Sequence, residues 1–304
     1  MAEVSRIRLC EGGPEFSRLV FGLWRLREWQ LSTRDLQELL EGCLELGITT
    51  FDHADIYGGY TCEALFGDLL QQAPDLKRRM ELVTKCGIQL ESANRPGTRI
   101  HHYDTSSQHI LRSVDNSLSS LAAEQLDLLL IHRPDPLMDA DEISEAFSEL
   151  KDSGKVKHFG VSNFTAHQFD LVSSRLPFPL VTNQVEISPM RLDTMFDGTL
   201  NHCQRLKIAP MAWSPLAGGR LFTGDDEQSV RVREALRRVG EQLGGYTLDQ
   251  VALAWLIRHP ANILPVLGSG RLERIQSAAK ALELDMNRQQ WFDILTASMG
   301  HDIP

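Results

Sequence analysis

The sequence has few cysteines, and their arrangement excludes two common kinds of stabilised scaffold. Only five are present among 304 residues, and no two of them form a C-x-x-C pair. Neither a disulfide framework nor a zinc ribbon is therefore indicated, and we predict no metal site. Thiols that are few and scattered are typical of proteins in a reducing compartment, so we expect a cytoplasmic protein.

Long apolar segments and excess positive charge are also missing. No stretch approaches the ~18 uninterrupted apolar residues that a membrane-spanning helix needs, and residues 1–6 have no apolar run of the signal-peptide type. The formal net charge is −10 at pH 7, so no broad basic surface is available to neutralise phosphates. We therefore expect neither a nucleic-acid partner nor a membrane partner, although a local basic pocket for one small anion stays open.

The sequence also lacks the pattern G-x-G-x-x-G, so a Rossmann dinucleotide site is not indicated. What is present is a composition of 42% hydrophobic and 24% charged residues, which is typical of a globular protein with a large core. The length would permit two domains, but α/β barrels hold as many residues in one. No linker, low-complexity tract or short repeat interrupts the chain, and we predict a single domain over residues 1–304.

Short apolar runs rich in β-branched residues alternate with longer amphipathic segments along the whole chain. This alternation indicates repeated βα units and a parallel sheet. Eight such runs are present, which is the number that a closed (β/α)8 TIM barrel requires. The predicted strands are residues 19–23, 49–52, 81–86, 126–131, 156–161, 181–186, 208–213 and 262–266.

The amphipathic segments have recognisable ends. Ser32 and Thr33 precede one apolar stripe, which stops at Gly47, and Ser106 and Ser107 precede another. Hydroxyl side chains are favoured at helix N-caps and glycine is favoured just after the last turn. We expect these segments to be helices that pack on the outside of the barrel.

Three segments depart from the regular spacing. Residues 5–18 precede the first strand and predict a small hairpin that plugs the N-terminal end of the barrel. Residues 87–105 and 217–246 lengthen the connections after the third and seventh strands, on the face where a barrel keeps its active site. We expect these two long loops to shape the substrate pocket and to cover the cofactor.

Polar residues end three of the predicted strands. Asp52 ends the second strand and Tyr57 follows it, Lys85 closes the third, and His132 closes the fourth. Each has an ordinary interpretation as well, namely a helix cap, an ion pair or a satisfied core histidine. Because barrel enzymes collect catalytic groups from the ends of different strands, four such residues together favour a catalytic site.

The set suits the reduction of a carbonyl. A free tyrosine, with a pKa near ~10, holds its proton too tightly for easy acid catalysis, and a neighbouring ammonium lowers that pKa. Lys85 can supply this charge, and Asp52 can keep the lysine cationic. His132 can hydrogen-bond the carbonyl oxygen, leaving Tyr57 to deliver the proton.

These residues lie in motifs that resemble the aldo-keto reductase superfamily. Residues 47–57 are similar to the family signature Gly-x-x-x-x-Asp-x-Ala-x-x-Tyr, and Glu63 and Gly67 match the residues that follow it. The blocks 130–132, 154–164 and 183–186 are also similar to family motifs. The resemblance covers almost the whole chain and implies that Asp52, Tyr57, Lys85 and His132 form the catalytic tetrad.

The resemblance further implies NADP(H) as the cofactor. Ser162, Asn163 and Gln184 match the residues that hydrogen-bond the nicotinamide carboxamide, and Trp213 matches an aromatic that stacks on the nicotinamide ring. Taken alone, residues 162–164 could equally be a helix N-cap. The other cofactor-binding residues implied are Gly22 and Trp24 at the first strand, Ser214, Pro215, Leu216 and Gly218 around the pyrophosphate, and Gly268, Ser269, Gly270 and Arg274 at the extra phosphate of NADPH.

The match is incomplete beyond Arg274. Ser277 and Ala278 occupy the place of the Glu-Asn pair with which the family holds the adenine, so the NADP preference stays open. Arg271 can be a phosphate ligand or a solvated surface charge. Trp24 can be a wall of the substrate pocket or a core tryptophan. Arg133, Met190 and Arg191 are further candidates for the pocket.

The resemblance implies reduction of small aldehydes or ketones to alcohols, with Tyr57 as general acid. A nucleotide-binding regulatory protein on the same barrel is the main alternative, because some family members are channel β-subunits. A barrel isomerase or aldolase that uses Lys85 is a second alternative, against which the set of cofactor-binding residues weighs. A monomer is the default for the resemblance, and an oligomer stays open.

Overall fold

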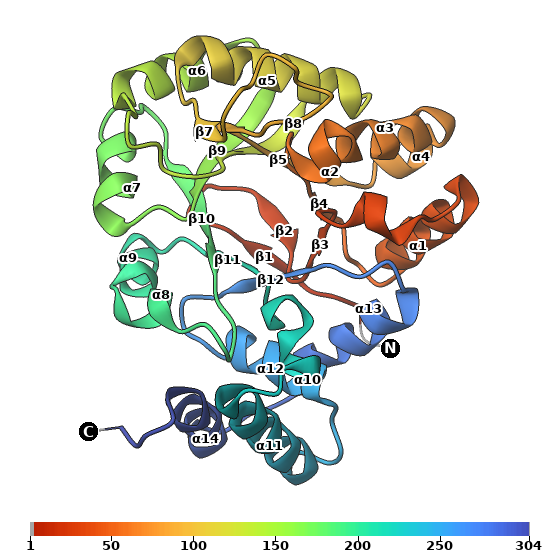
Figure 1. The fold of residues 1–304 in the computed structure, drawn as a ribbon, viewed down its shortest axis with the longest axis vertical. Helices are drawn as coiled ribbons and strands as arrows, with labels where there is room; N and C mark the ends of the chain where they lie inside the picture. The colour runs from red at the N-terminus through yellow and green to blue at the C-terminus, as the bar shows by residue number, and fades with distance from the viewer. Residues whose placement is uncertain (1–2, 304) are drawn as a thin grey trace.

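Eight parallel strands form a closed barrel in the computed structural model, which describes residues 3–303. The barrel strands are β3 (Val20–Gly22), β4 (Thr50–Asp52), β5 (Glu81–Cys86), β8 (Leu126–Ile131), β9 (Val156–Ser162), β10 (Leu180–Glu186), β11 (Met211–Trp213) and β12 (Leu264–Leu267). Around the barrel they follow chain order, and β12 pairs with β3 to close it (Figure 1). All eight overlap the predicted runs, which confirms the predicted (β/α)8 barrel.

Helices surround the barrel on its outer side (Figure 1). The α-helices are α1 (Thr33–Glu45), α2 (Tyr57–Tyr60), α3 (Cys62–Gln72), α4 (Pro74–Lys77), α5 (Ser107–Ser120), α6 (Ala140–Asp152), α7 (Ala166–Ser173), α8 (Asp193–Phe196), α9 (Thr199–Leu206), α10 (Arg220–Thr223), α11 (Glu227–Gln242), α12 (Leu248–Ile257), α13 (Leu272–Ala279) and α14 (Arg288–Met299). The short 3-10 helices within the described residues are η1 (Leu26–Trp29), η2 (Ala217–Gly219) and η3 (Lys280–Glu283). No helix within residues 3–303 is long and apolar enough to cross a bilayer.

The predicted helix starts are confirmed. The Ser32 side chain accepts a hydrogen bond from the Asp35 amide and so caps α1, and Ser106 does the same for α5. Each cap satisfies one of the amides that a helix leaves free at its N-terminus. Gly47 follows α1 with a φ of 82°, a conformation that glycine adopts without strain.

Side chains of a barrel strand point alternately outward, to the helices, and inward, to the barrel interior. Phe51 of β4 packs against Phe66 of α3, with ring centroids 5.9 Å apart, on the outer side of the barrel. Successive side chains of a strand point to opposite faces, so the next residue, Asp52, points inward. It meets Lys85 of β5 there. The same alternation therefore buries apolar side chains under the helices and delivers charged ones to the barrel interior.

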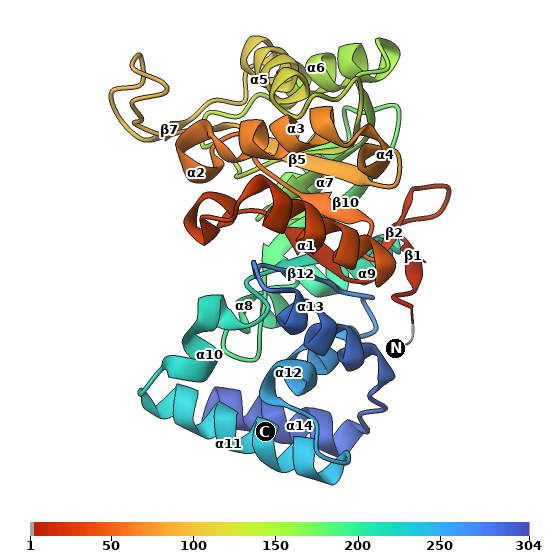
Figure 2. The same cartoon turned by 90° about the vertical axis from the view of Figure 1, so that its right-hand side faces the viewer.

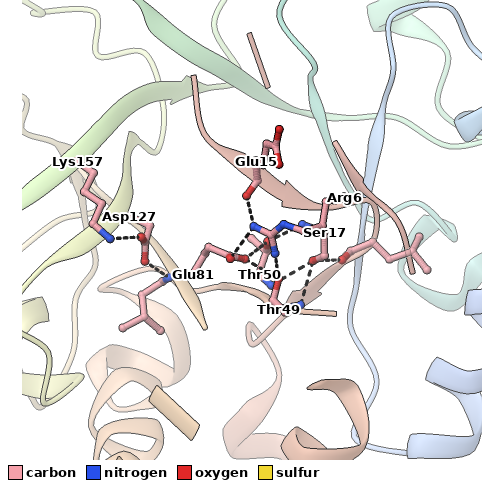
Figure 3. Close-up of polar contacts among 10 residues, drawn as sticks. Arg6, Glu15, Ser17, Thr49, Thr50, Glu81, Asp127 and Lys157 are labelled. Atoms are coloured by element: carbon pink, nitrogen blue, oxygen red, sulfur yellow. Dashed lines mark hydrogen bonds and ion pairs between the residues drawn. The ribbon is translucent and has the colours of Figure 1, made fainter. Parts of the chain in front are cut away.

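A hairpin closes the N-terminal end of the barrel, as predicted. It consists of β1 (Arg6–Arg8) and β2 (Glu15–Ser17), which pair antiparallel. Arg6 donates to Thr49 Oγ1 over 2.7 Å and forms an ion pair with Glu81 at 2.8 Å, so the hairpin is fastened to the starts of β4 and β5 (Figure 3). Ser17 Oγ accepts from the amides of residues 49 and 50.

The two long connections are more ordered than expected. Residues 217–246 are mostly helical rather than structureless, because Asp226 caps α11 and Val232, Ala235, Leu236 and Val239 recur at helical spacing and are buried. Figure 2 shows α11 beside α14, below the barrel. The connection 87–105 carries a two-stranded excursion, β6 (Ile88–Gln89) and β7 (His102–Tyr103).

Candidate active site

A groove of about 790 Å3 runs across the C-terminal ends of the barrel strands. This is the face on which barrel enzymes carry their active sites. The predicted catalytic and cofactor-binding residues that line it are Gly22, Trp24, Asp52, Tyr57, His132, Ser162, Asn163, Gln184, Trp213, Ser214, Pro215, Leu216, Gly218, Gly268, Ser269 and Arg274. Residues that lie up to about 250 positions apart in the chain are thus brought to one cavity.

Lys85 lies beneath the floor of the groove and is completely buried. Its Nζ atom is 2.8 Å and 2.7 Å from the two carboxylate oxygens of Asp52 and 2.7 Å from the carbonyl oxygen of His53. It is also 3.0 Å from Tyr57 Oη. The ammonium therefore connects the buried carboxylate to a hydroxyl that faces the groove.

Burial and ion pairing act in opposite directions on these groups. Burial lowers the pKa of Lys85, but the Asp52 carboxylate and the hydrogen bonds to Asp52 and Tyr57 outweigh it and leave that pKa above its ordinary value. Burial also raises the pKa of Tyr57, and Lys85 offsets only part of this rise. Lys85 thus lowers the pKa of Tyr57, as expected, but burial outweighs this effect and leaves that pKa above its ordinary value. Tyr57 keeps its proton at neutral pH.

His132 faces Tyr57 across the groove, with ring centroids 5.9 Å apart in an edge-on arrangement. Burial first, and then the charges of Lys85 and Arg133, hold the pKa of His132 well below its usual range. A neutral imidazole has one N–H donor and one acceptor nitrogen. His132 Nδ1 is buried and has no partner within residues 3–303. The ring is therefore fit to donate a hydrogen bond without carrying charge.

The predicted carboxamide ligands form one connected network. Asn163 has a φ of 60°, and its side chain donates to Ser162 Oγ over 2.8 Å while accepting from Trp213 Nε1 over 2.9 Å. Gln184 Nε2 donates to Asp52 Oδ1 over 2.9 Å. These bonds fix the amides and the indole beside the tetrad, so the wall of the groove is rigid here.

Two backbone features flank the middle of the groove. Ala217, Gly218 and Gly219 all have positive φ values, which curls the chain directly after β11. Turns of this kind present successive amides to an anion. On the opposite side lies the N-terminal turn of α13 with Arg274, which is exposed and forms no ion pair among residues 3–303. Arg271 is instead paired with Glu273 at 2.7 Å.

Some predicted residues lie elsewhere. Gly270 does not line the groove. A Cβ on it would come within 2.6 Å of the Trp29 ring, so a glycine is needed there for packing. Met190 and Arg191 line a separate shallow recess near α8 and α14. Trp24 is 53% exposed and lines the groove, which excludes the interpretation as a core tryptophan.

Sequence reasoning missed several groove residues. Arg133, a further candidate from the sequence, does line the groove, with its guanidinium 5.5 Å from the centre of the Trp213 ring. The missed residues are Arg25, Ile56, Ile88, Gly219, Phe222, Thr223, Asp249, Val266, Leu267, Glu273 and Ile275, whereas Ser277 and Ala278, which stand at the family's adenine position, line the groove as well. Ile88 comes from the first long connection, and Phe222 and Thr223 come from the second. Both connections therefore contribute to the groove, as expected.

The turn that carries Tyr57 is fastened to the β6–β7 excursion. Gly58, Gly59 and Tyr60 all have positive φ values, which is uncommon for a tyrosine. Tyr60 Oη accepts from the Leu90 amide over 2.8 Å, and Asn94 Nδ2 donates to the Gly59 carbonyl over 2.9 Å. The excursion thereby holds the unusual backbone that aims Tyr57.

Two further carboxyl groups are buried behind the tetrad. Asp55 Oδ2 accepts from Ser113 Oγ over 2.8 Å, whereas Oδ1 has no partner within the described residues. Burial, followed by the nearby charge of Glu63, raises the pKa of Asp55 to about 7. Burial also raises the pKa of Glu63. Burial therefore makes ionisation of both carboxyl groups less favourable than it is in water.

Asp55→Asn is expected to stabilise the protein by up to about 4 kcal/mol at pH 8 and by only about 1.5 kcal/mol at pH 5. The pKa of Asp55 is about 7 in the folded protein and about 4 in the unfolded chain. Between these pH values the unfolded chain releases the proton and the folded protein keeps it, so the free energy of unfolding falls as the pH rises. Asparagine resembles the protonated acid and avoids this loss. Thermal unfolding of wild-type protein and Asp55→Asn at both pH values tests this prediction. Equal increases in stability at pH 5 and pH 8 would contradict the ionisation argument.

Comparisons with known proteins agree with this geometry. Residues 18–297 match the model of the Aldo/keto reductase family. The chain is 56% identical over 301 residues to "Uncharacterized oxidoreductase YcsN" of Bacillus subtilis (strain 168), covering 99% of this chain and 100% of the relative. It is 47% identical to a "6-dehydroglucose reductase" of Agrobacterium fabrum, covering 95% and 96%.

A solved structure is similar as well. A thermostable aldo-keto reductase, Tm1743, crystallised with the inhibitor epalrestat, superposes with a TM-score of 0.79 at 25% identity, covering 96% of this chain and 99% of that one. The barrel, the groove at its C-terminal end, the family match and these relatives all point to the same family. The chain belongs to the aldo/keto reductase family of oxidoreductases, whose members broadly reduce carbonyl compounds.

Proposed function

We propose that the protein reduces aldehyde or ketone groups of small molecules to alcohols with NADPH, and that Tyr57 is the general acid. The observation that carries this proposal is the contact between Lys85 Nζ and Tyr57 Oη, at 3.0 Å, with Asp52 beneath it. A protonated tyrosine at the floor of a groove, backed by a buried ammonium, can give up a proton to a developing alkoxide.

The residues of the groove fit a nicotinamide dinucleotide. Its volume is in the range of small-molecule sites, and its lining includes both tetrad residues and residues of α13. The rigid network of Asn163 and Trp213 can hold a flat ring and its amide, and the curled backbone at 217–219 can take a pyrophosphate. When bound, the nicotinamide supplies the hydride that adds to the carbonyl carbon.

The chain's own groups then handle the oxygen of the carbonyl. His132, neutral in this setting, donates a hydrogen bond that orients the oxygen toward Tyr57. Tyr57 Oη transfers its proton to that oxygen, so one hydride and one proton convert the carbonyl to an alcohol. Lys85 stabilises the phenolate left behind, and solvent restores the proton.

Arg274→Ala is expected to weaken NADPH binding about 10- to 100-fold and to change NADH binding little. Arg274 lines the groove, and it forms no ion pair among residues 3–303, so its guanidinium is free for the extra phosphate. Fluorescence titration with each nucleotide gives the two dissociation constants. Arg271→Ala, which removes a paired guanidinium, is the matched control, and equal losses for both nucleotides in Arg274→Ala would contradict the role.

A panel of carbonyl compounds tests the proposed function. Two relatives carry the name 6-dehydroglucose reductase, so 6-dehydroglucose belongs in the panel beside simple aldehydes, ketones and dicarbonyls. Loss of absorbance at the nicotinamide band is followed with NADPH and, in parallel, with NADH. We expect faster turnover with NADPH. Binding of NADPH without reduction of any carbonyl would instead favour the nucleotide-binding regulatory protein.

A further inference from the structure

The far end of the groove lacks the residues that the family uses to hold adenine. Ser277 and Ala278 stand where the family has its Glu-Asn pair, and both line the groove. They lie three and four residues after Arg274 in α13, so all three share one face of that helix. A ring that sits beside a phosphate held at Arg274 would therefore reach Ser277 and Ala278.

A carboxylate from another helix reaches the same place. Asp249 lies in the first turn of α12, which packs against α13, and it also lines the groove. Its Oδ2 atom accepts from Ser277 Oγ over 2.9 Å, and its Oδ1 atom accepts from Thr247 Oγ1 over 2.6 Å. The serine that departs from the family pattern is therefore hydrogen-bonded to an acid that the family pattern did not predict.

The orientation of this carboxylate is fixed from both sides. Ser277 Oγ accepts from Gln250 Nε2 over 3.0 Å, so its own proton is directed to Asp249. Gln250 is in turn held by the Thr247 amide, which donates to Gln250 Oε1 over 2.9 Å. A carboxylate has about four acceptor sites, and the bonds from Ser277 and Thr247 use one on each oxygen, so acceptor capacity is left for a ligand in the groove.

Adenine offers one hydrogen-bond donor, its exocyclic amine. The small methyl group of Ala278 leaves room for a flat ring over α13, and Asp249 supplies the acceptor at its edge. We propose that Asp249 recognises the adenine of the cofactor by accepting from this amine, with Ser277 as its positioning residue. The proposal rests on the proposed NADP(H) function and adds to it a residue that selects the purine.

Asp249 also stabilises its own helix, and the experiment must distinguish this effect from recognition of adenine. An acidic residue in the first turn of a helix stabilises that helix, whatever occupies the groove. Asp141 occupies the equivalent first-turn position of α6 and lies outside the groove. Asp141→Asn therefore removes a matched helix charge without touching the purine end.

The test compares two nucleotides that differ at position 6 of the purine and at the neighbouring N1, which is an acceptor in adenine and an N–H donor in hypoxanthine. Deamino-NADPH carries hypoxanthine, in which a carbonyl oxygen replaces the exocyclic amine, so Asp249 would face an acceptor instead of a donor. Dissociation constants are measured by titration of intrinsic fluorescence, with no substrate present. We expect wild-type protein and Asp141→Asn to prefer NADPH about tenfold, because one hydrogen bond to a charged group is at stake.

The variants decide between recognition and structure. Asp249→Asn presents an amide that can donate to the hypoxanthine oxygen, so its preference should shrink to about twofold or reverse. Ser277→Ala, which frees the carboxylate to turn, should reduce the preference in part. The ratio of two affinities in one variant is insensitive to a general loss of stability.

Three outcomes would overturn the proposal. Equal affinity of wild-type protein for the two nucleotides would remove the adenine contact and leave the NADPH function standing. An unchanged ratio in Asp249→Asn, with both affinities lowered, would reduce Asp249 to a structural role. Binding of neither nucleotide by wild-type protein would remove the proposed function together with this inference.

Discussion

Tyr57→Phe is expected to lower kcat for carbonyl reduction by about 10²- to 10⁴-fold while leaving the dissociation constant of NADPH within about twofold. The phenyl ring keeps the edge-on contact with His132, but the hydroxyl beside Lys85 is lost. No other hydroxyl is bonded to Lys85 Nζ within residues 3–303, so no side chain there replaces the proton donor.

Single-turnover and steady-state kinetics, with nucleotide binding measured separately, test this prediction. Tyr103→Phe is a suitable control, because Tyr103 is a partly buried tyrosine of β7 that does not line the groove. We expect near wild-type kinetics in the control. A Tyr57→Phe variant with more than a tenth of wild-type kcat would refute Tyr57 as the general acid.

Lys85→Met is expected to abolish measurable turnover and to destabilise the fold by about 3–5 kcal/mol. Methionine fills a similar volume, but the Asp52 carboxylate is left buried at 2% exposure without its countercharge. Its remaining partner is the Gln184 amide, which donates to Oδ1. The loss of stability then comes from a buried carboxylate without a counterion. The loss of activity comes from a Tyr57 phenolate that no ammonium stabilises.

The double variant Asp52→Asn with Lys85→Met separates these causes. Replacing both members of a buried ion pair by neutral residues is often close to neutral for stability. Denaturant unfolding should therefore show most of the lost stability restored in the double variant, whereas kcat should stay as low as in Lys85→Met. Recovery of turnover along with stability would mean that Lys85 acts only by holding the barrel together.

The barrel could be predicted because its signals are local and repeat. Each strand is a short apolar run, and the polar residue that ends it emerges at the C-terminal face whatever the details of packing. Asp52 and Lys85 were found in this way, and their distance of 2.7 Å follows from the pairing of β4 with β5. Tyr57 follows β4 and His132 follows β8, so the order of strands around the barrel places both near Asp52 and Lys85.

Other features depend on contacts that no single segment contains. Asp249 could not be chosen from its own segment, because its place in the groove arises only when α12 packs against α13. Gly270 looked like a phosphate-binding glycine, yet the distant Trp29 ring explains its size. The sequence shows that Tyr57 has a charged neighbour, but the depth of its burial, a property of the whole fold, decides that its pKa is raised.

The bonds between the Tyr57 turn and the β6–β7 excursion affect how new specificities can arise on this barrel. An excursion transplanted from a relative would bring new pocket side chains such as the one at Ile88, but it would also replace the donors at Leu90 and Asn94 that hold residues 59 and 60. If Tyr57 is the acid, as proposed, its placement and the pocket side chains of the excursion then change together. We expect a grafted excursion to retain full activity only when it is exchanged together with residues 57–60.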